Sequence, residues 1–410
     1  MPSRHRPALL LGALVGFQTL LPLFVLARSS RHALPGLPLY RYDPRDGDAY
    51  GYYSALRELL STWQRDGRLL IPLACVAALV LVIAWRRSRS TVARILIVAW
   101  ACGLVSAVLV ERIRFTGAPQ IGWPLVWSVP LLPYRAVGLP LDPNVAFGFG
   151  LAISLLANAV TVVMTYALGR LSSRRQGVAL GAATLVALGP LLMLLDPRHQ
   201  SYRNGTWQIL LGLALYTEPL STALVLSALV LVLRGGGWTA DAAIGGALLG
   251  LAALVRVSNG LIAACLVLAL VWRRDRSRAL AVVVGGLAFL PALVVFWPKG
   301  YPMLQPPVYP AHPFEFAYAR DAWSDSLLWH PSVLAALVPV ALVGLFAVRR
   351  TVGLVLAGTA AATAVLYTFY ALTPMHPRFL FVLVPPVMVL WAAGAAAIAS
   401  RAGALYHRPR

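Results

Sequence analysis

Three carboxylates lie close together near the amino-terminal end of the chain. Asp43, Asp46 and Asp48 fall within six positions, although the sequence has only 14 acidic residues. A carboxylate held beside a hydroxyl group accepts its proton, which is the task of a general base. Asp48 is the leading candidate for a base because it stands directly before a predicted helix, and Asp46 is the second. The alternative for Asp48 is a helix N-cap, which requires no chemistry.

The residues after Asp48 predict an amphipathic helix. Gly67 provides its end. Because one face is apolar and the other polar, we expect the helix to lie along the membrane surface, within a first outer loop at 28–68. The apolar face holds Tyr52, Leu56, Leu59, Leu60 and Trp63, and the opposite face holds Ser54, Arg57, Glu58, Ser61 and Arg65.

A second group of candidate residues lies farther along the chain. Glu218 is set into an apolar run at the mouth of a predicted span, where a carboxylate needs a cation or a functional role. Arg256 lies in a short turn beside Ser258 and Asn259. Two interpretations stay open: a structural ion pair between Glu218 and Arg256, or a phosphate site in which Arg256 and Asn259 donate hydrogen bonds.

Three further segments suit the walls of a binding site. His376 and Arg378 stand in a turn before the last predicted helix. The loop at 298–331 mixes aromatic and polar residues, which suits either acceptor binding by sugar stacking or a plain amphipathic surface helix. The Pro-rich stretch at 119–143 is either a re-entrant segment that lines a cavity or an ordinary surface loop.

The elements that position these residues are membrane-spanning helices. Hydrophobic residues make up 59% of the chain and charged residues 12%, with a mean hydropathy of +0.75. This composition predicts an all-α integral membrane protein, with 1–410 as a single polytopic membrane domain and no soluble domain. We count about twelve apolar segments that are long enough to cross a bilayer. They are 7–27, 69–85, 95–110, 144–169, 177–195, 217–233, 240–256, 257–272, 279–297, 332–348, 351–370 and 379–399.

Short basic connections predict the orientation in the cell membrane. Cytoplasmic loops collect arginine and lysine, so the connections near Arg86, Arg174, Arg274 and Arg349 belong in the cytoplasm. Both termini fall on that side, the first helix is expected to be uncleaved, and the candidate site faces the extracytoplasmic side. The net charge of +21 is spread over many short loops, so it does not indicate a nucleic-acid partner.

Several motifs resemble those of the polytopic C-type (GT-C) glycosyltransferases, which take sugars from polyprenyl phosphates. Their order and their shared outer placement are more specific than any single motif. The paired acidic residues common in that family are Asp48-Ala49 here, so the second carboxylate is Asp46, Asp43 or absent. The motifs are Gly47-Asp48-Ala49-Tyr50-Gly51-Tyr52-Tyr53-Ser54-Ala55-Leu56-Arg57, Leu215-Tyr216-Thr217-Glu218-Pro219-Leu220, Gly250-Leu251-Ala252-Ala253-Leu254-Val255-Arg256 and His376-Pro377-Arg378-Phe379-Leu380.

The resemblance implies transfer of a sugar from a polyprenyl-phosphate donor to an extracytoplasmic glycan, lipid or protein acceptor, at the bilayer surface. An Asp would act as general base, and inversion at the anomeric carbon is the simpler expectation. No cofactor is required by this chemistry, with a divalent metal as the alternative. The substrate-binding residues would be Tyr50, Tyr53, Glu218, Arg256, Asn259, His376 and Arg378.

Other functions fit parts of the same pattern. About twelve spans with both ends inside are also common in secondary transporters and lipid-linked glycan flippases, but these usually place polar coupling groups near the bilayer midplane. Within the predicted spans, Gln18 and Asn158 are the main polar residues, whereas the acids gather at the outer rim. A glycan ligase that uses a polyprenyl diphosphate and a structural membrane subunit are the remaining alternatives.

Overall fold

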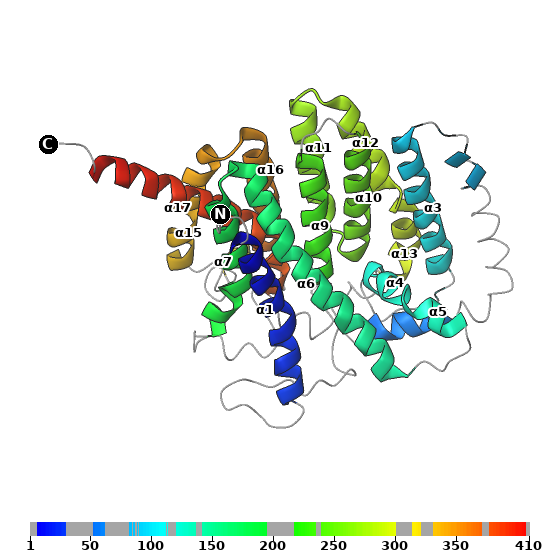
Figure 1. Ribbon diagram of the computed structural model, residues 1–410. Coiled ribbons are helices and arrows are strands. Elements are labelled where there is room, and N and C mark those ends of the chain that lie inside the picture. Colours follow the sequence, from blue (N-terminus) through cyan, green and yellow to red (C-terminus); the bar gives the residue numbers. More distant parts are fainter. Residues whose placement is uncertain are drawn as a thin grey trace. The chain divides into compact units, whose positions relative to one another are not determined.

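The computed structural model of the protein is built from helices (Figure 1). Among the residues that it describes there is no β-strand, and a single β-bridge joins Phe314 to Tyr370. The chain divides into two compact units: unit 1 comprises 1–41, 155–214 and 312–410, and unit 2 comprises 42–154 and 215–311. The described residues are 6–29, 52–61, 82–83, 85–86, 88, 90–111, 113, 120–136, 142–194, 217–234, 239–300, 314–320, 331–370 and 377–406.

Unit 2 is organised around a bundle in which α10 is central. Helix α10 packs against α9, α11 and α12, and these four helices stand side by side in Figure 1. Helix α3 packs on α10 and α13, and the short helix α4 packs on α10. The helices of this unit are α3 (Thr91–Glu111), α4 (Gly122–Ser128), α5 (Leu131–Ala136), the start of α6 (Pro143–Ser173), α9 (Glu218–Leu233), α10 (Thr239–Val255), α11 (Asn259–Trp272), α12 (Arg276–Leu287) and α13 (Leu290–Gly300).

Glycines let the central helices of unit 2 approach closely. A Cβ atom at Gly246 of α10 would collide with the backbone of Val282 in α12, and one at Gly285 would collide with the backbone near Ala243. Small residues such as these let two apolar helices approach each other closely. Inside a membrane, van der Waals packing between such helices replaces the hydrophobic driving force. The bundle that carries Glu218 and Arg256 is therefore tightly packed.

Unit 1 holds the remaining helices. Helix α17 packs against α15, α7 and α16, and α1 packs on α7. Gln18 of α1 donates its Nε2 hydrogen to the carbonyl of Ala187 at 2.5 Å, which fixes a polar side chain inside this packing. The helices are α1 (Arg6–Ser29), the rest of α6, α7 (Gln176–Leu194), α15 (Pro331–Ala347), α16 (Arg350–Thr368), the 3-10 helix η4 (Pro377–Leu383) and α17 (Val384–Tyr406).

The prediction of an all-α membrane protein is confirmed. Within the described part of the chain, 5 helices are long and apolar enough to cross a membrane, and shorter apolar helices accompany them. Eleven of the predicted spans coincide with helices, and most of the segment at 69–85 lies outside the described residues. The long apolar helices are Thr91–Glu111, Val145–Ser173, Arg276–Pro298, Arg350–Thr368 and Phe379–Ala404.

Within its described residues, 120–136 and 142–143, the Pro-rich stretch forms short helices. Helix α4 ends at Ser128 and α5 begins at Leu131, so the chain is interrupted at Val129-Pro130. Trp123 and Trp127 of α4 are both 0% exposed. Helix α4 is therefore buried in protein, whereas Val129 at the interruption is 62% exposed. That the stretch lines a cavity stays a prediction.

Candidate functional site

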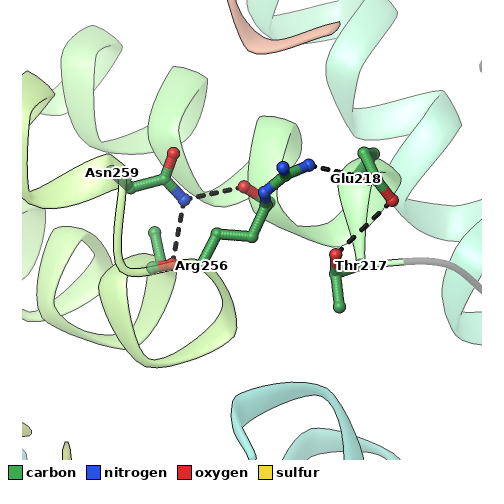
Figure 2. Close-up of polar contacts among 6 residues, drawn as sticks. Thr217, Glu218, Arg256 and Asn259 are labelled. Atoms are coloured by element: carbon green, nitrogen blue, oxygen red, sulfur yellow. Dashed lines mark hydrogen bonds and ion pairs between the residues drawn. The ribbon is translucent and has the colours of Figure 1, made fainter. Parts of the chain in front are cut away.

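A buried ion pair joins the beginning of α9 to the end of α10. Arg256 donates from Nη1 to Oε1 of Glu218 at 2.7 Å (Figure 2). The two side chains are only 8% and 4% exposed. Thr217 lies beside the carboxylate, with its hydroxyl donating to Oε2 of Glu218 at 3.4 Å. The structural ion pair that the sequence suggested is therefore present.

The ends of the two helices explain why these charges meet. Glu218 is the first residue of α9, where the exposed backbone N–H groups favour a negative charge, and Arg256 directly follows the last residue of α10, where the carbonyl groups favour a positive one. Since α9 and α10 are packed together, the acidic start of one helix faces the basic end of the other. The helix dipoles and the ion pair favour the same arrangement.

Asn259 completes this polar cluster from the start of α11. Its Nδ2 donates to Oγ of Ser221 at 2.7 Å and to the carbonyl of Ala252 at 2.9 Å (Figure 2). The side-chain amide therefore ties α9, α10 and α11 together. The role of Asn259 as a phosphate contact stays a prediction, and a phosphate would have to replace one of these two bonds.

Helix α4 packs directly against the residues that precede Arg256. A Cβ atom at Gly122 would collide with the backbone of Leu254 and Val255. Such contact is possible only for glycine, so the first residue of α4 is held on the last residues of α10. The Pro-rich stretch and the arginine-bearing turn are thus neighbours within unit 2.

The helix that follows the Asp-rich stretch also packs onto α4. The structure shows a helix at 52–61 in which Leu56 and Leu60 are buried and Arg57 is exposed. The ring of Tyr53 lies 6.3 Å from that of Trp127 in α4 and 5.0 Å from that of Phe147 in α6. The predicted amphipathic pattern is confirmed, but its apolar face is buried in protein and does not lie open to lipid.

Tyr53 is part of this packing, and its burial has an electrostatic effect. Desolvation raises the pKa of its phenol and Asp142 raises it further, while Arg57 opposes the change. The phenol thus remains protonated at neutral pH. Its predicted role of framing a sugar ring stays a prediction, because one side of the residue is already occupied by Trp127 and Phe147.

A second group of predicted residues meets within unit 1. The ring of Phe379, which follows Arg378 in η4, lies 5.6 Å from Tyr370 at the end of α16. Phe314 of the loop at 298–331 lies 5.3 Å from the same tyrosine. The backbone N–H of Glu315 donates to the carbonyl of Phe369 at 3.1 Å. The possible acceptor-binding loop and the turn with Arg378 are thus joined at one helix end.

Several candidate residues lie outside the described part of the chain. These are Asp43, Asp46, Asp48, Tyr50 and His376, while Arg378 is described only by its backbone in η4. Among the described residues, no group of His, Cys, Asp and Glu could hold a metal ion. The dependence of the protein on a divalent metal therefore stays open.

Sequence reasoning missed two features of the polar interior. Ser221 was not singled out, although its spacing of three from Glu218 places both on one face of α9. Helix α6 also carries a buried polar stripe, of which the sequence analysis named only Asn158, and spacings of four, three and four residues place its members on one face. Its members are Ser154, Asn158, Thr161 and Thr165, each 0% exposed.

Comparison with known proteins gives no assignment. No protein-family model matches this sequence, and no curated protein matches it. Any function therefore has to be argued from the residues of this chain.

Proposed function

We propose that this protein is a membrane glycosyltransferase with about twelve spans and a GT-C-like fold. It moves a sugar from a polyprenyl-phosphate donor to an extracytoplasmic glycan, lipid or protein acceptor. One observation carries the proposal: α4 links the helix that follows Asp48 to the turn that holds Arg256. Tyr53 packs on Trp127 of this helix, and Gly122 packs against the residues before Arg256.

The proposed reaction needs few groups. The carboxylate of Asp48 accepts the proton of the acceptor hydroxyl, whose oxygen forms a bond to the anomeric carbon. The bond between that carbon and the phosphate oxygen breaks, and polyprenyl phosphate leaves with the electron pair. Because phosphate is a good leaving group, no second carboxylic acid is needed, unlike in the hydrolysis of a glycoside. A single displacement of this kind inverts the anomeric configuration.

Arg256 is the proposed contact for the donor phosphate. Guanidinium groups suit phosphate oxygens because their planar donors match phosphate geometry. Glu218 holds this guanidinium through Nη1 and so fixes its orientation. In this proposal the ion pair positions the arginine, and the structural and binding roles belong to the same side chain.

The test is a comparison of Asp48→Asn with Asp46→Asn and Asp43→Asn in purified, folded protein. Asn keeps the shape and the N-capping ability of Asp48 but cannot take a proton. Transfer from polyprenyl-phosphate sugar should fall by roughly 100-fold or more in Asp48→Asn, the usual contribution of a positioned base. Binding of the donor should survive. Near-normal turnover in Asp48→Asn, with collapse in one of the other variants, would move the base to that residue.

A secondary transporter is the second candidate, and the buried stripe on α6 favours it. Polar groups inside membrane helices often line pathways for ions or substrates. However, Thr161 donates to the carbonyl of Ala157 at 2.9 Å and Thr165 to that of Thr161 at 2.7 Å, so two of the hydroxyls are satisfied by their own helix. Proteoliposomes in which a polyprenyl-linked sugar moves from one leaflet to the other, without transfer of the sugar to an acceptor, would support the transporter.

A further inference from the structure

Three tryptophans in the described part of the chain donate their indole N–H group across a helix contact. Trp100 donates to the carbonyl of Val284 at 3.1 Å, Trp127 to that of Ala146 at 2.7 Å, and Trp391 to that of Ala336 at 3.3 Å. In each case the acceptor belongs to a different helix. Trp127 is the one of these three that is fully buried, and a buried donor without an acceptor costs about 1 to 3 kcal/mol.

Trp123 departs from this pattern. Its side chain is 0% exposed, yet its Nε1 has no hydrogen-bond partner among the described residues. Trp127 is an internal comparison, because it lies one turn away on α4, is also 0% exposed, and has its ring 5.9 Å from that of Trp123. Burial in the same aromatic cluster therefore does not account for the missing acceptor.

An acceptor without a donor lies three residues before Trp123. Oε1 of Gln120 is buried and likewise has no partner within the described part of the chain. An N–H group and a carbonyl oxygen together match hydroxyl groups, since a hydroxyl both accepts and donates. Gln120 is only half-buried, so a molecule that binds here would enter beside its side chain.

The position of these two residues connects them to the candidate site. Gly122 lies between them and packs against the backbone of Leu254 and Val255, immediately before Arg256. Gln120 and Trp123 thus flank in sequence the residue through which α4 contacts α10. Trp123 lies against the ring of Trp127, and an aromatic surface suits a saccharide better than a second phosphate.

We propose that Trp123 Nε1 and Gln120 Oε1 bind hydroxyl groups of the transferred sugar. This inference rests on the proposed glycosyltransferase function and assigns the part of the site that selects the saccharide. Trp123 donates to a sugar hydroxyl and Gln120 accepts from one, while Arg256 holds the phosphate of the same donor. A buried water with the same hydrogen bonds is the competing occupant.

The experiment measures binding of two kinds of probe to purified full-length protein in detergent. Farnesyl phosphate lacks a sugar, and synthetic farnesyl-phosphoryl glucose, mannose, galactose and arabinose carry one. The ratio of the two dissociation constants isolates the contribution of the sugar. Trp123→Phe keeps an aromatic ring and removes the N–H, and Trp127→Phe is the matched control because its indole already has an acceptor in Ala146.

We expect Trp123→Phe to reduce the sugar-dependent gain in affinity by about two- to ten-fold, the usual contribution of one hydrogen bond, with unchanged binding of farnesyl phosphate. Trp127→Phe should lower the melting temperature and leave the gain intact. A deoxy-sugar probe that lacks the bound hydroxyl should bind the wild type more weakly than the full sugar probe does. Its dissociation constant should be the same for the wild type and for Trp123→Phe. Gln120→Met removes the acceptor and provides the same test if Trp123→Phe does not fold.

The binding measurements distinguish failure of the proposed sugar contact from failure of the proposed glycosyltransferase function. If the wild type gains affinity from a sugar and both Trp123→Phe and Gln120→Met keep that gain, the proposed sugar contact is wrong and water occupies the position. Equal weakening of both probe types would also overturn it, because the change would then act on the whole site. If no sugar increases the affinity of the wild type over farnesyl phosphate, the proposed function falls together with the inference.

Discussion

Two buried arginines lie at opposite ends of α9 and are satisfied in different ways. At its beginning, Arg256 pairs with Glu218, whose side chain is only 4% exposed. At its end, Arg278 of α12 donates from Nη2 to the carbonyl of Val232 and from Nη1 to Asp275 at 3.3 Å. The side chain of Asp275 is 31% exposed, so this second carboxylate remains in contact with solvent.

The comparison separates helix capping from a buried charge pair. The last carbonyl groups of a helix have no partner within it, and a cation there satisfies them and complements the helix dipole. The two Nη contacts of Arg278 are explained in this way, with Asp275 also capping α12 through the backbone N–H of Arg278, while Nε of Arg278 is buried without a partner among the described residues. The pair of Arg256 and Glu218 buries two charges, and the residues directly before Arg256 contact α4. A functional role is therefore the better explanation at this end of α9.

The largest effect is expected for Arg256→Gln. Removing one partner of a buried pair leaves the other charge uncompensated, which costs about 3 to 5 kcal/mol of folding free energy. Chemical denaturation in mixed micelles measures this loss. If Arg256 also holds the donor phosphate, the folded fraction should bind farnesyl phosphate more weakly, and Arg256→Lys should restore this binding only in part.

The double variant Glu218→Gln/Arg256→Gln controls for the uncompensated charge. It should unfold less readily than Arg256→Gln, because no buried charge remains. Its binding of farnesyl phosphate should stay weak. Full recovery of binding in the double variant would show that Arg256 has only a structural role.

Arg278→Gln should have a smaller effect. A hydrogen bond to a charged group contributes about 1.5 to 3 kcal/mol, and the loss of this side chain leaves a carboxylate that water still reaches. The same denaturation experiment should therefore show a smaller loss than for Arg256→Gln, with no change in binding of farnesyl phosphate. A loss as large as that of Arg256→Gln would contradict the distinction between the two ends.

The ion pair and the helix at 52–61 are features that the sequence predicts. Glu218 was a candidate because a carboxylate in an apolar run needs a cation, and Arg256 lies in a turn predicted on the same side of the membrane. The apolar periodicity at 52–60 predicted a helix with one apolar face. In the structure Leu56, Leu59 and Leu60 of that face are all buried. Local pattern and charge balance are sufficient for predictions of this kind.

Tertiary partners could not be predicted in the same way. The apolar face of the helix at 52–61 would look the same whether it lay on lipid or packed on protein, and only the structure shows Tyr53 against Trp127. Trp123 and Trp127 are equivalent in sequence terms, although only one donates to a carbonyl. The difference depends on the position of α6, which no local pattern in α4 specifies.

The smallest expected loss of stability, and the sharpest functional contrast, comes from two glycines, Gly122 at the start of α4 and Gly246 in the middle of α10. A Cβ atom at Gly122 would lie 2.7 Å from the carbonyl oxygen of Leu254, and one at Gly246 would lie 2.8 Å from Cα of Val282. Gly122→Ala and Gly246→Ala should each cost about 1 to 3 kcal/mol, since a packed helix contact has to separate. Denaturation alone should not distinguish the two variants.

Turnover per folded molecule should distinguish them. Gly122→Ala moves α4 away from Arg256, and with it the aromatic contact that holds the helix after Asp48. A misplacement of about 1 Å between reacting groups lowers a rate by up to roughly 100-fold, so transfer should fall sharply. Gly246→Ala disturbs only the contact between α10 and α12 and should leave transfer near normal once stability is corrected. Equal turnover in the two variants would mean that α4 does not connect the carboxylate to the arginine.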